Sequence, residues 1–91
     1  MSASREDPYA LDDAGLLGVW CLRNPEADTQ ASVIRFLVEL CEGGPSLEGQ
    51  GSDIVWAPVE DGFKEVPITW VVDHELRLVR LAMLGEHLRS T

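Results

Sequence analysis

The sequence predicts an α+β fold in which a helical hairpin packs on one face of a three- to four-stranded antiparallel sheet. Two patterns predict it: apolar side chains recur at helical spacing between residues 24 and 42, and alternate between residues 63 and 72. Helix signals precede strand signals, which gives the order ααβββ. A chain of 91 residues suffices for one domain with one modest core. We therefore expect residues 11–91 to form a single domain.

A first helix is expected over residues 14–22. Asp12 or Asp13 can cap it, because a carboxylate accepts hydrogen bonds from the free N–H groups of a first helical turn. The apolar run at residues 16–22 is equally typical of a buried strand, and both interpretations stay open.

The second helix is expected to begin with Asn24 as its N-cap and Pro25 in the first helical position. Its apolar stripe has five central members and two that widen it: Val33, Ile34, Leu37, Val38 and Cys41, with Phe36 and Leu40. Gly43-Gly44-Pro45 is expected to end the helix, because glycine adopts the left-handed cap conformation and proline cannot continue a helix.

After a glycine-rich loop at residues 43–53, strands are expected at residues 54–58, 63–72 and 76–83. Turns are expected at Glu60-Asp61-Gly62 and Asp73-His74-Glu75. In the middle strand, Pro67 lacks an N–H donor and predicts an edge or a bulge.

The last strand has a competing interpretation. Its apolar pattern changes phase at residues 78/79, which a β-bulge would absorb. The alternative is a helix over residues 74–89. We favour the strand, because a helix here would place apolar residues on every side.

Residues 1–10 are expected to form a flexible N-terminal arm. They contain no apolar signal segment, and no apolar run is long enough to span a membrane, so we expect a cytoplasmic protein without membrane contact. Cys21 and Cys41 lie far apart, with no CxxC and no histidine at ligand spacing. Two reduced thiols, no metal and no cofactor are therefore expected.

Sixteen acidic and seven basic residues give a formal net charge of −9, which repels polyanions. The segment 74–91 alone has no acidic excess, because it holds Arg77, Arg80 and Arg89 against Glu75 and Glu86. Contact with nucleic acid is therefore expected only through this C-terminal segment.

The same segment holds the candidate catalytic residues, Arg80, His87 and Arg89. Such a cationic group can grip a phosphate or stabilise negative charge in a transition state. The alternative is that the arginines are solvated neighbours of strand residues and that His87 lies in a frayed tail.

The candidate binding residues are Trp56 and Arg77. Trp56 lies on a short strand beside the glycine-rich loop, which favours its exposure. His74, flanked by two acidic residues, is either a general base or a solvated turn residue.

Residues 24–88 resemble the RelE/ParE superfamily, the bacterial toxins of type II toxin–antitoxin systems. The likeness rests on Ile68–Leu81, which contains the turn Asp73-His74-Glu75, and on Leu84-Gly85-Glu86-His87 after it. A helix ending in Gly-Gly-Pro and followed by Leu47-Glu48-Gly49 adds to it. The family packs a helical hairpin against an antiparallel sheet.

The resemblance implies a toxin with an antitoxin partner, acting on translation as a ribosome-dependent endoribonuclease or acting on a protein target. It implies charge stabilisation by Arg80 and Arg89 and proton transfer by His87. The chain departs from the family in three ways. Family toxins are usually basic, and their first strand precedes the hairpin. Their His-Arg pair after the glycine is displaced here, because Glu86 follows Gly85, His87 comes one place late, and Arg89 follows only after Leu88.

The alternative hypothesis is a small acidic interaction or inhibitor domain that docks on a basic partner without catalysis. A third hypothesis is a homo-oligomer that associates through the sheet edge near Pro67.

Overall fold

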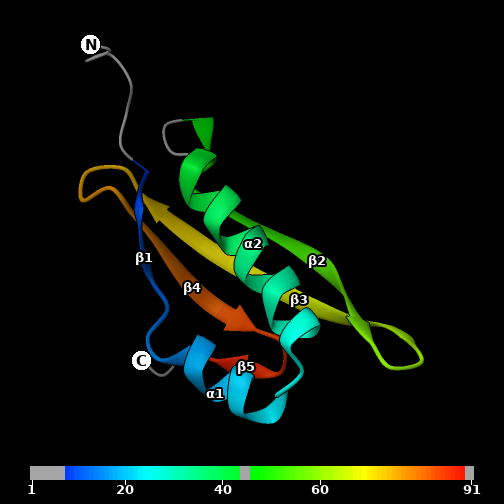
Figure 1. The fold of residues 1–91 in the computed structure, drawn as a ribbon. Helices are drawn as coiled ribbons and strands as arrows, with labels where there is room; N and C mark the ends of the chain where they lie inside the picture. The colour runs from blue at the N-terminus through cyan, green and yellow to red at the C-terminus, as the bar shows by residue number, and fades with distance from the viewer. Residues whose placement is uncertain (1–7, 44–45, 90–91) are drawn as a thin grey trace.

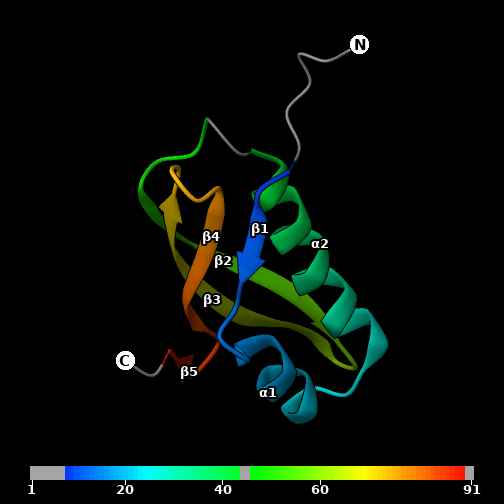
Figure 2. The same ribbon diagram turned by 90° about the vertical axis from the view of Figure 1, so that its left-hand side faces the viewer.

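The computed structural model describes residues 8–43 and 46–89 and has the predicted α+β class. Its helices are α1 (Leu16–Arg23) and α2 (Ala27–Gly43). Its strands are β1 (Ala10–Asp12), β2 (Gln50–Val59), β3 (Gly62–Asp73), β4 (Leu78–Leu84) and β5 (His87–Leu88). Both helices lie on the same side of the sheet (Figures 1 and 2), and no helix of the described residues covers the other side.

The strand order is β1-β4-β3-β2, with β5 paired to β4. All pairings are antiparallel except that of β1, which runs parallel to β4 and was not expected from the sequence. Residues 1–7 of the expected N-terminal arm lie outside the described residues. Tyr9 and Ala10 belong to the folded body, because Tyr9 is buried and its N–H donates to the carbonyl of Cys41 at 3.0 Å.

The helix expected over residues 14–22 is present as α1, which runs from Leu16 to Arg23, and Asp13 supports its start. The Asp13 carboxylate accepts hydrogen bonds from the backbone N–H groups of Gly15 and Leu17 at 3.3 and 3.1 Å. The prediction that Asn24 caps the second helix is wrong. Its side-chain amide donates to the carbonyl of Trp20 at 2.9 Å and so closes α1, while α2 begins at Ala27.

One row of the predicted α2 stripe faces solvent. Ile34 and Val38 are exposed, whereas the helix buries the adjacent row: Thr29, Val33, Leu37, Leu40 and Cys41. Thr29 takes part because its hydroxyl donates to the carbonyl of Pro58 in β2. The helix therefore buries the row that contacts β2, although that row includes the polar Thr29.

The alternation in β3 is confirmed, because Val66, Ile68, Trp70 and Val72 are all buried. Glu60 and Asp61 form the predicted turn between β2 and β3. The predicted loop at residues 43–53 is too long, since β2 already begins at Gln50. The carbonyl of Gly49 also accepts from the N–H of Val72, which extends the pairing by one more residue.

Pro67 lies where β3 leaves β4, because pairing between these strands begins at Ile68. Its carbonyl accepts from the N–H of Gly85 at 2.8 Å, so the carbonyl and the nitrogen of Pro67 both point to the β4 side of β3. Because the ladder with β4 begins only at Ile68, the missing N–H of Pro67 removes no ladder hydrogen bond. The bulge of β4 is at Ala82, between the pairs Thr69–Met83 and Trp70–Leu81, and not at residues 78/79. It brings both Leu81 and Leu84 into the core.

Trp20 and Trp70 are core residues, whereas Trp56 is not. Gly51 in β2 lies opposite Trp70, and a Cβ at Gly51 would lie 2.7 Å from Cζ2 of the Trp70 ring. The buried indole thus occupies space that only a glycine leaves open.

We expect Gly51→Ala to lower the free energy of unfolding by about 1–3 kcal/mol, because the ring of Trp70 cannot move without repacking the core. Urea unfolding measures this change. Gly18→Ala is the control, since nothing lies within 4 Å of its added Cβ. In the helix it should stabilise by up to about 1 kcal/mol. Equal effects of the two substitutions would contradict the close approach.

Candidate functional site

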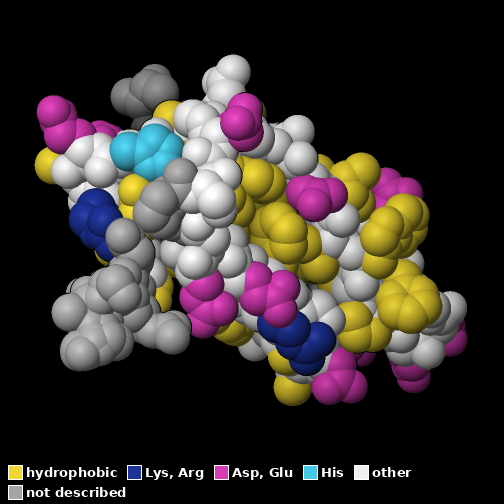
Figure 3. All heavy atoms as spheres, turned by 90° about the horizontal axis from the view of Figure 1, so that it is seen from above, with side chains coloured by type: hydrophobic (Ala, Val, Ile, Leu, Met, Phe, Trp, Pro, Cys, Tyr) yellow, Lys and Arg dark blue, Asp and Glu magenta, His cyan; other side chains and the backbone are white. Residues whose placement is uncertain are grey.

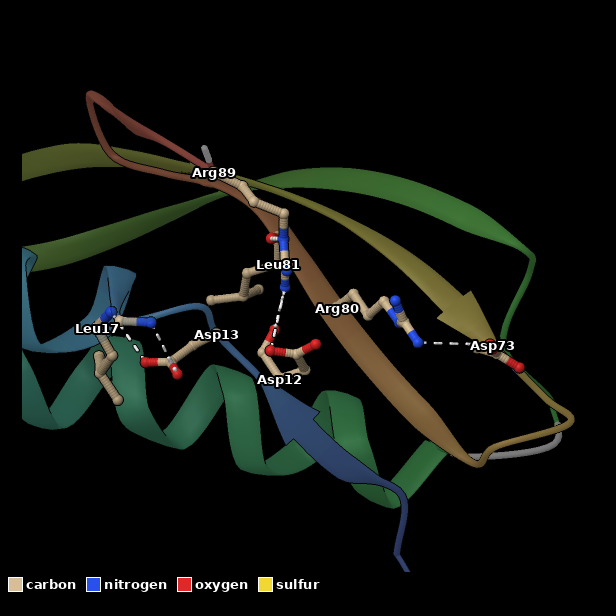
Figure 4. A network of polar contacts seen from close by, with 8 residues as sticks. Asp12, Asp13, Leu17, Asp73, Arg80, Leu81 and Arg89 are labelled. Atoms are coloured by element: carbon tan, nitrogen blue, oxygen red, sulfur yellow. Dashed lines mark hydrogen bonds and ion pairs between the residues drawn. The ribbon is translucent and has the colours of Figure 1, made fainter. Parts of the chain in front are cut away.

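Arg89 joins both ends of the described chain. Its Nε donates to the carbonyl of Leu81 at 2.7 Å, and its Nη2 donates to the carbonyl of Asp12 at 2.7 Å. The Asp12 carboxylate lies 3.3 Å from the same Nη2 (Figure 4). The guanidinium thereby holds β1 and β4 together, which is a structural role.

Arg80 uses a different carboxylate. Its Nη2 lies 3.8 Å from the Asp73 carboxylate, and in Figure 4 its side chain points along β4 toward Asp73 and away from Arg89. Its Nε is buried and has no hydrogen-bond partner within the described residues. The two arginines thus serve separate acidic residues and do not converge on one point.

His87 lies on a third part of the surface. It pairs with Leu84 in the β4–β5 ladder, and its Nε2 is buried without a hydrogen-bond partner in the described part of the chain. It lines a polar pocket with Trp20, Lys64 and Glu86, and neither Arg80 nor Arg89 lines this pocket. The structure therefore does not assemble the three candidates into one catalytic cluster.

Arg77 and His74 surround Tyr9. The Arg77 guanidinium lies 4.8 Å from the centroid of the Tyr9 ring, a cation–π contact. His74 Nε2 lies 3.1 Å from the carbonyl of Leu47 and donates to it, and His74 Nδ1 is hydrogen-bonded to the Tyr9 hydroxyl at 2.8 Å. Both ring nitrogens of His74 are engaged, and the residue fastens the β3–β4 turn to its neighbours.

Trp56 is exposed, with 59% of its surface accessible. It lies in β2 directly opposite Glu65 of β3. Because side chains alternate along a strand, and Ala57 is buried beneath α2, Trp56 points to the uncovered side of the sheet. The sequence suggested Trp56 but missed Glu65, whose place beside the indole follows only from the register of the hairpin.

Acidic side chains are spread over the face shown in Figure 3. Viewed from above (Figure 3), Asp and Glu side chains lie among hydrophobic ones that gather over one half of the visible face, and Lys and Arg are few.

Among the described residues, no three or more His, Cys, Asp or Glu side chains form a group that could hold a metal ion. In the same residues, no helix is both long and apolar enough to cross a membrane.

Both cysteines are free thiols. Cys41 is buried and Cys21 half-buried. Burial raises the pKa of the Cys41 thiol above its ordinary value, and the negative charge of Glu42 raises it further. Cys41 is therefore a core residue with little thiolate near neutral pH.

No family model, no curated protein and no solved structure matches this chain. Within the described residues, the candidate functional groups are two arginines paired with separate carboxylates, a histidine apart from both, and an indole exposed beside a carboxylate.

We expect Arg89→Ala to lower the free energy of unfolding by about 1–3 kcal/mol, because it removes two hydrogen bonds from a charged group that joins β1 to β4. The control is Arg23→Ala, which removes an exposed ion pair with Glu86 and should cost less than about 1 kcal/mol. Chemical denaturation of both variants measures the difference. Similar losses would show that Arg89 is no more important than a surface residue.

Iodoacetamide at pH 8 is expected to alkylate Cys21 faster than Cys41, because the thiolate is the reacting species and a raised pKa lowers its fraction at Cys41. Mass spectrometry of the two peptides measures the rates, and the denatured chain is the control in which they should converge. The raised pKa of Cys41 also lowers the free energy of unfolding as pH rises through the alkaline range, because the unfolded chain loses this proton at a lower pH than the folded chain. Faster reaction at Cys41 would contradict its burial.

Proposed function

We propose that this chain is a RelE/ParE-like toxin module that acts by binding a protein target and does not itself cleave RNA. The observation that carries the proposal is the separation of Arg80, His87 and Arg89. Arg80 pairs with Asp73, Arg89 holds Asp12, and His87 lines a pocket that neither arginine reaches. Cleavage of RNA needs cationic and proton-transferring groups around one phosphate.

The element order supports the RelE/ParE part of the proposal. The resemblance implies a strand ahead of the helical hairpin, and β1 occupies that place and joins the sheet beside β4. The helices then pack on one face of the β2–β3–β4 meander, with the turn at residues 74–77 between β3 and β4.

Charge supports a protein target over RNA. The chain carries a formal net charge of −9, so its field repels a polyanion and attracts a basic protein surface. The arginines of the C-terminal segment add little attraction for phosphate where they are already paired with carboxylates.

We propose that the protein acts in the bacterial cytoplasm and is held inactive by an antitoxin.

A second candidate function is an acidic interaction or inhibitor domain that docks on a basic partner and is not toxic. The charge of −9 favours it equally, since it needs neither catalysis nor a toxin's target. The two candidates differ in what expression does to a bacterial cell.

Controlled expression in bacteria, with viability counts, tests the proposal. The wild-type chain is compared with an Arg80→Gln/His87→Asn variant, which leaves Arg89 in place because Arg89 joins β1 to β4. We expect both chains to arrest growth, since neither residue is needed to bind a protein. Thermal unfolding of the purified variant verifies that it is folded.

Two outcomes oppose the proposal. Arrest that is relieved in the folded variant would assign catalysis to Arg80 or His87. Harmless expression of both chains would remove the toxin and leave the acidic interaction domain, which salt-dependent binding to a basic protein would then test.

A further inference from the structure

The side of the sheet that faces away from α2 is its outer face. Side chains alternate between the two faces, and those of the outer face in β2 and β3 include Ile54, Trp56, Phe63, Glu65, Pro67, Thr69 and Val71. Among them Phe63 is 67% exposed and Trp56 59%. No helix of the described residues covers this face (Figure 2), so its apolar side chains meet solvent.

The apolar side chains of the outer face border a shallow depression. Ile54, Trp56, Pro67, Thr69 and Met83 line it, with Ser52, Asp53 and the neighbouring Ile68. An exposed aromatic residue beside a recess is typical of a docking surface, because a partner can fill the recess and cover the ring.

The charges around Trp56 have one sign. Glu65 lies opposite Trp56, and Glu60 and Asp61 form the adjoining turn. None of these three carboxylates belongs to an ion pair between described residues. Lys64, next to Glu65, points to the inner face and donates to the side-chain oxygen of Asn24.

This charge pattern determines whether a partner of the outer face must be acidic or basic. A second copy of the chain would bring its own net charge of −9 and the same carboxylates to the interface, and like charges would oppose pairing. A basic segment of another protein would meet complementary charge. The outer-face cation Arg80 lies at the far end, where it is already paired with Asp73.

We propose that Trp56 and Glu65 bind an arginine side chain of a basic protein segment that docks on the outer face. Residues directly opposite in an antiparallel pair have their Cβ atoms about 5 Å apart, so one guanidinium can reach both. Its plane stacks on the indole, and its N–H groups donate to the carboxylate. Arginine suits the pair better than lysine, because a planar cation makes both contacts at once. The site rests on the protein-binding part of the proposed function.

A titration of the ¹⁵N-labelled full chain with a short oligoarginine peptide tests the site by NMR. We expect a saturable shift of the Trp56 indole N–H and the Glu65 amide, with little change at the buried Trp20 and Trp70. The same peptide with citrulline at each position is the control, because citrulline keeps the planar shape and loses the charge. It should leave the Trp56 resonance unmoved.

Four variants separate the site from general attraction between opposite charges. Trp56→Ala and Glu65→Gln should each weaken peptide binding by about 2- to 30-fold. Glu39→Gln removes the same charge from the exposed side of α2 and should change the affinity by less than about twofold. Because Trp56 is largely exposed, its replacement should leave the unfolding midpoint almost unchanged, and Trp56→Phe should retain part of the affinity.

Two results of the peptide titration would overturn the site: equal weakening by Glu39→Gln and Glu65→Gln, or binding without any shift at Trp56. Viability counts distinguish this failure from failure of the proposed function. If a folded Trp56→Ala/Glu65→Gln chain arrests growth as the wild type does, the site is wrong and the toxin stands. If the wild-type chain binds arginine through Trp56 but is harmless, the site stands and the toxin is wrong.

Discussion

The structure depends on one row of β3 side chains, Val66, Ile68, Trp70 and Val72, which is buried between the sheet and its helices. β3 lies between β2 and β4, so this row sets the register of both neighbours. Only the face of the sheet that the helices cover is buried by the hydrophobic effect, because the described chain has helices on one side of the sheet. The opposite face is left to solvent as a direct result.

The few basic residues are used mainly to close this small fold. Arg89 joins β1 to β4, Arg77 covers the ring of Tyr9, and Lys64 reaches the end of α1 at Asn24. Each contact links segments far apart in the sequence. Three of the seven basic residues are thereby engaged in contacts within the chain, whereas the sixteen acidic residues give it a net charge of −9.

Local patterns predicted the parts of the fold that local forces determine. The alternation from Phe63 to Val72 identified β3 and its buried face, and Glu60-Asp61 identified the hairpin turn. The start of β2 was missed, because three glycines at residues 44, 49 and 51 favour a loop and only the packing of Trp70 on Gly51 explains the strand there. β1 was missed because three residues form a strand only when β4 and Arg89 hold them.

The candidate site shows the same division. Exposure of Trp56 followed from its place in the sequence, whereas the carboxylate beside it is nine residues away and is brought there by pairing. Conversely, Arg80, His87 and Arg89 are close in sequence but point to different surroundings, because successive strand residues alternate and β5 turns back along β4. Closeness in sequence was therefore misleading for the cations.

The parallel pairing of β1 with β4 affects the order in which the chain can fold during synthesis. The two helices and the β2–β3 hairpin are built from neighbouring segments, and each can form while later residues are still being added. β1 has no partner until β4 leaves the ribosome, and Arg89, which fixes it, follows 77 residues after Asp12. The first strand to be made is thus among the last to find its place, and until then the edge of β4 that it covers is open.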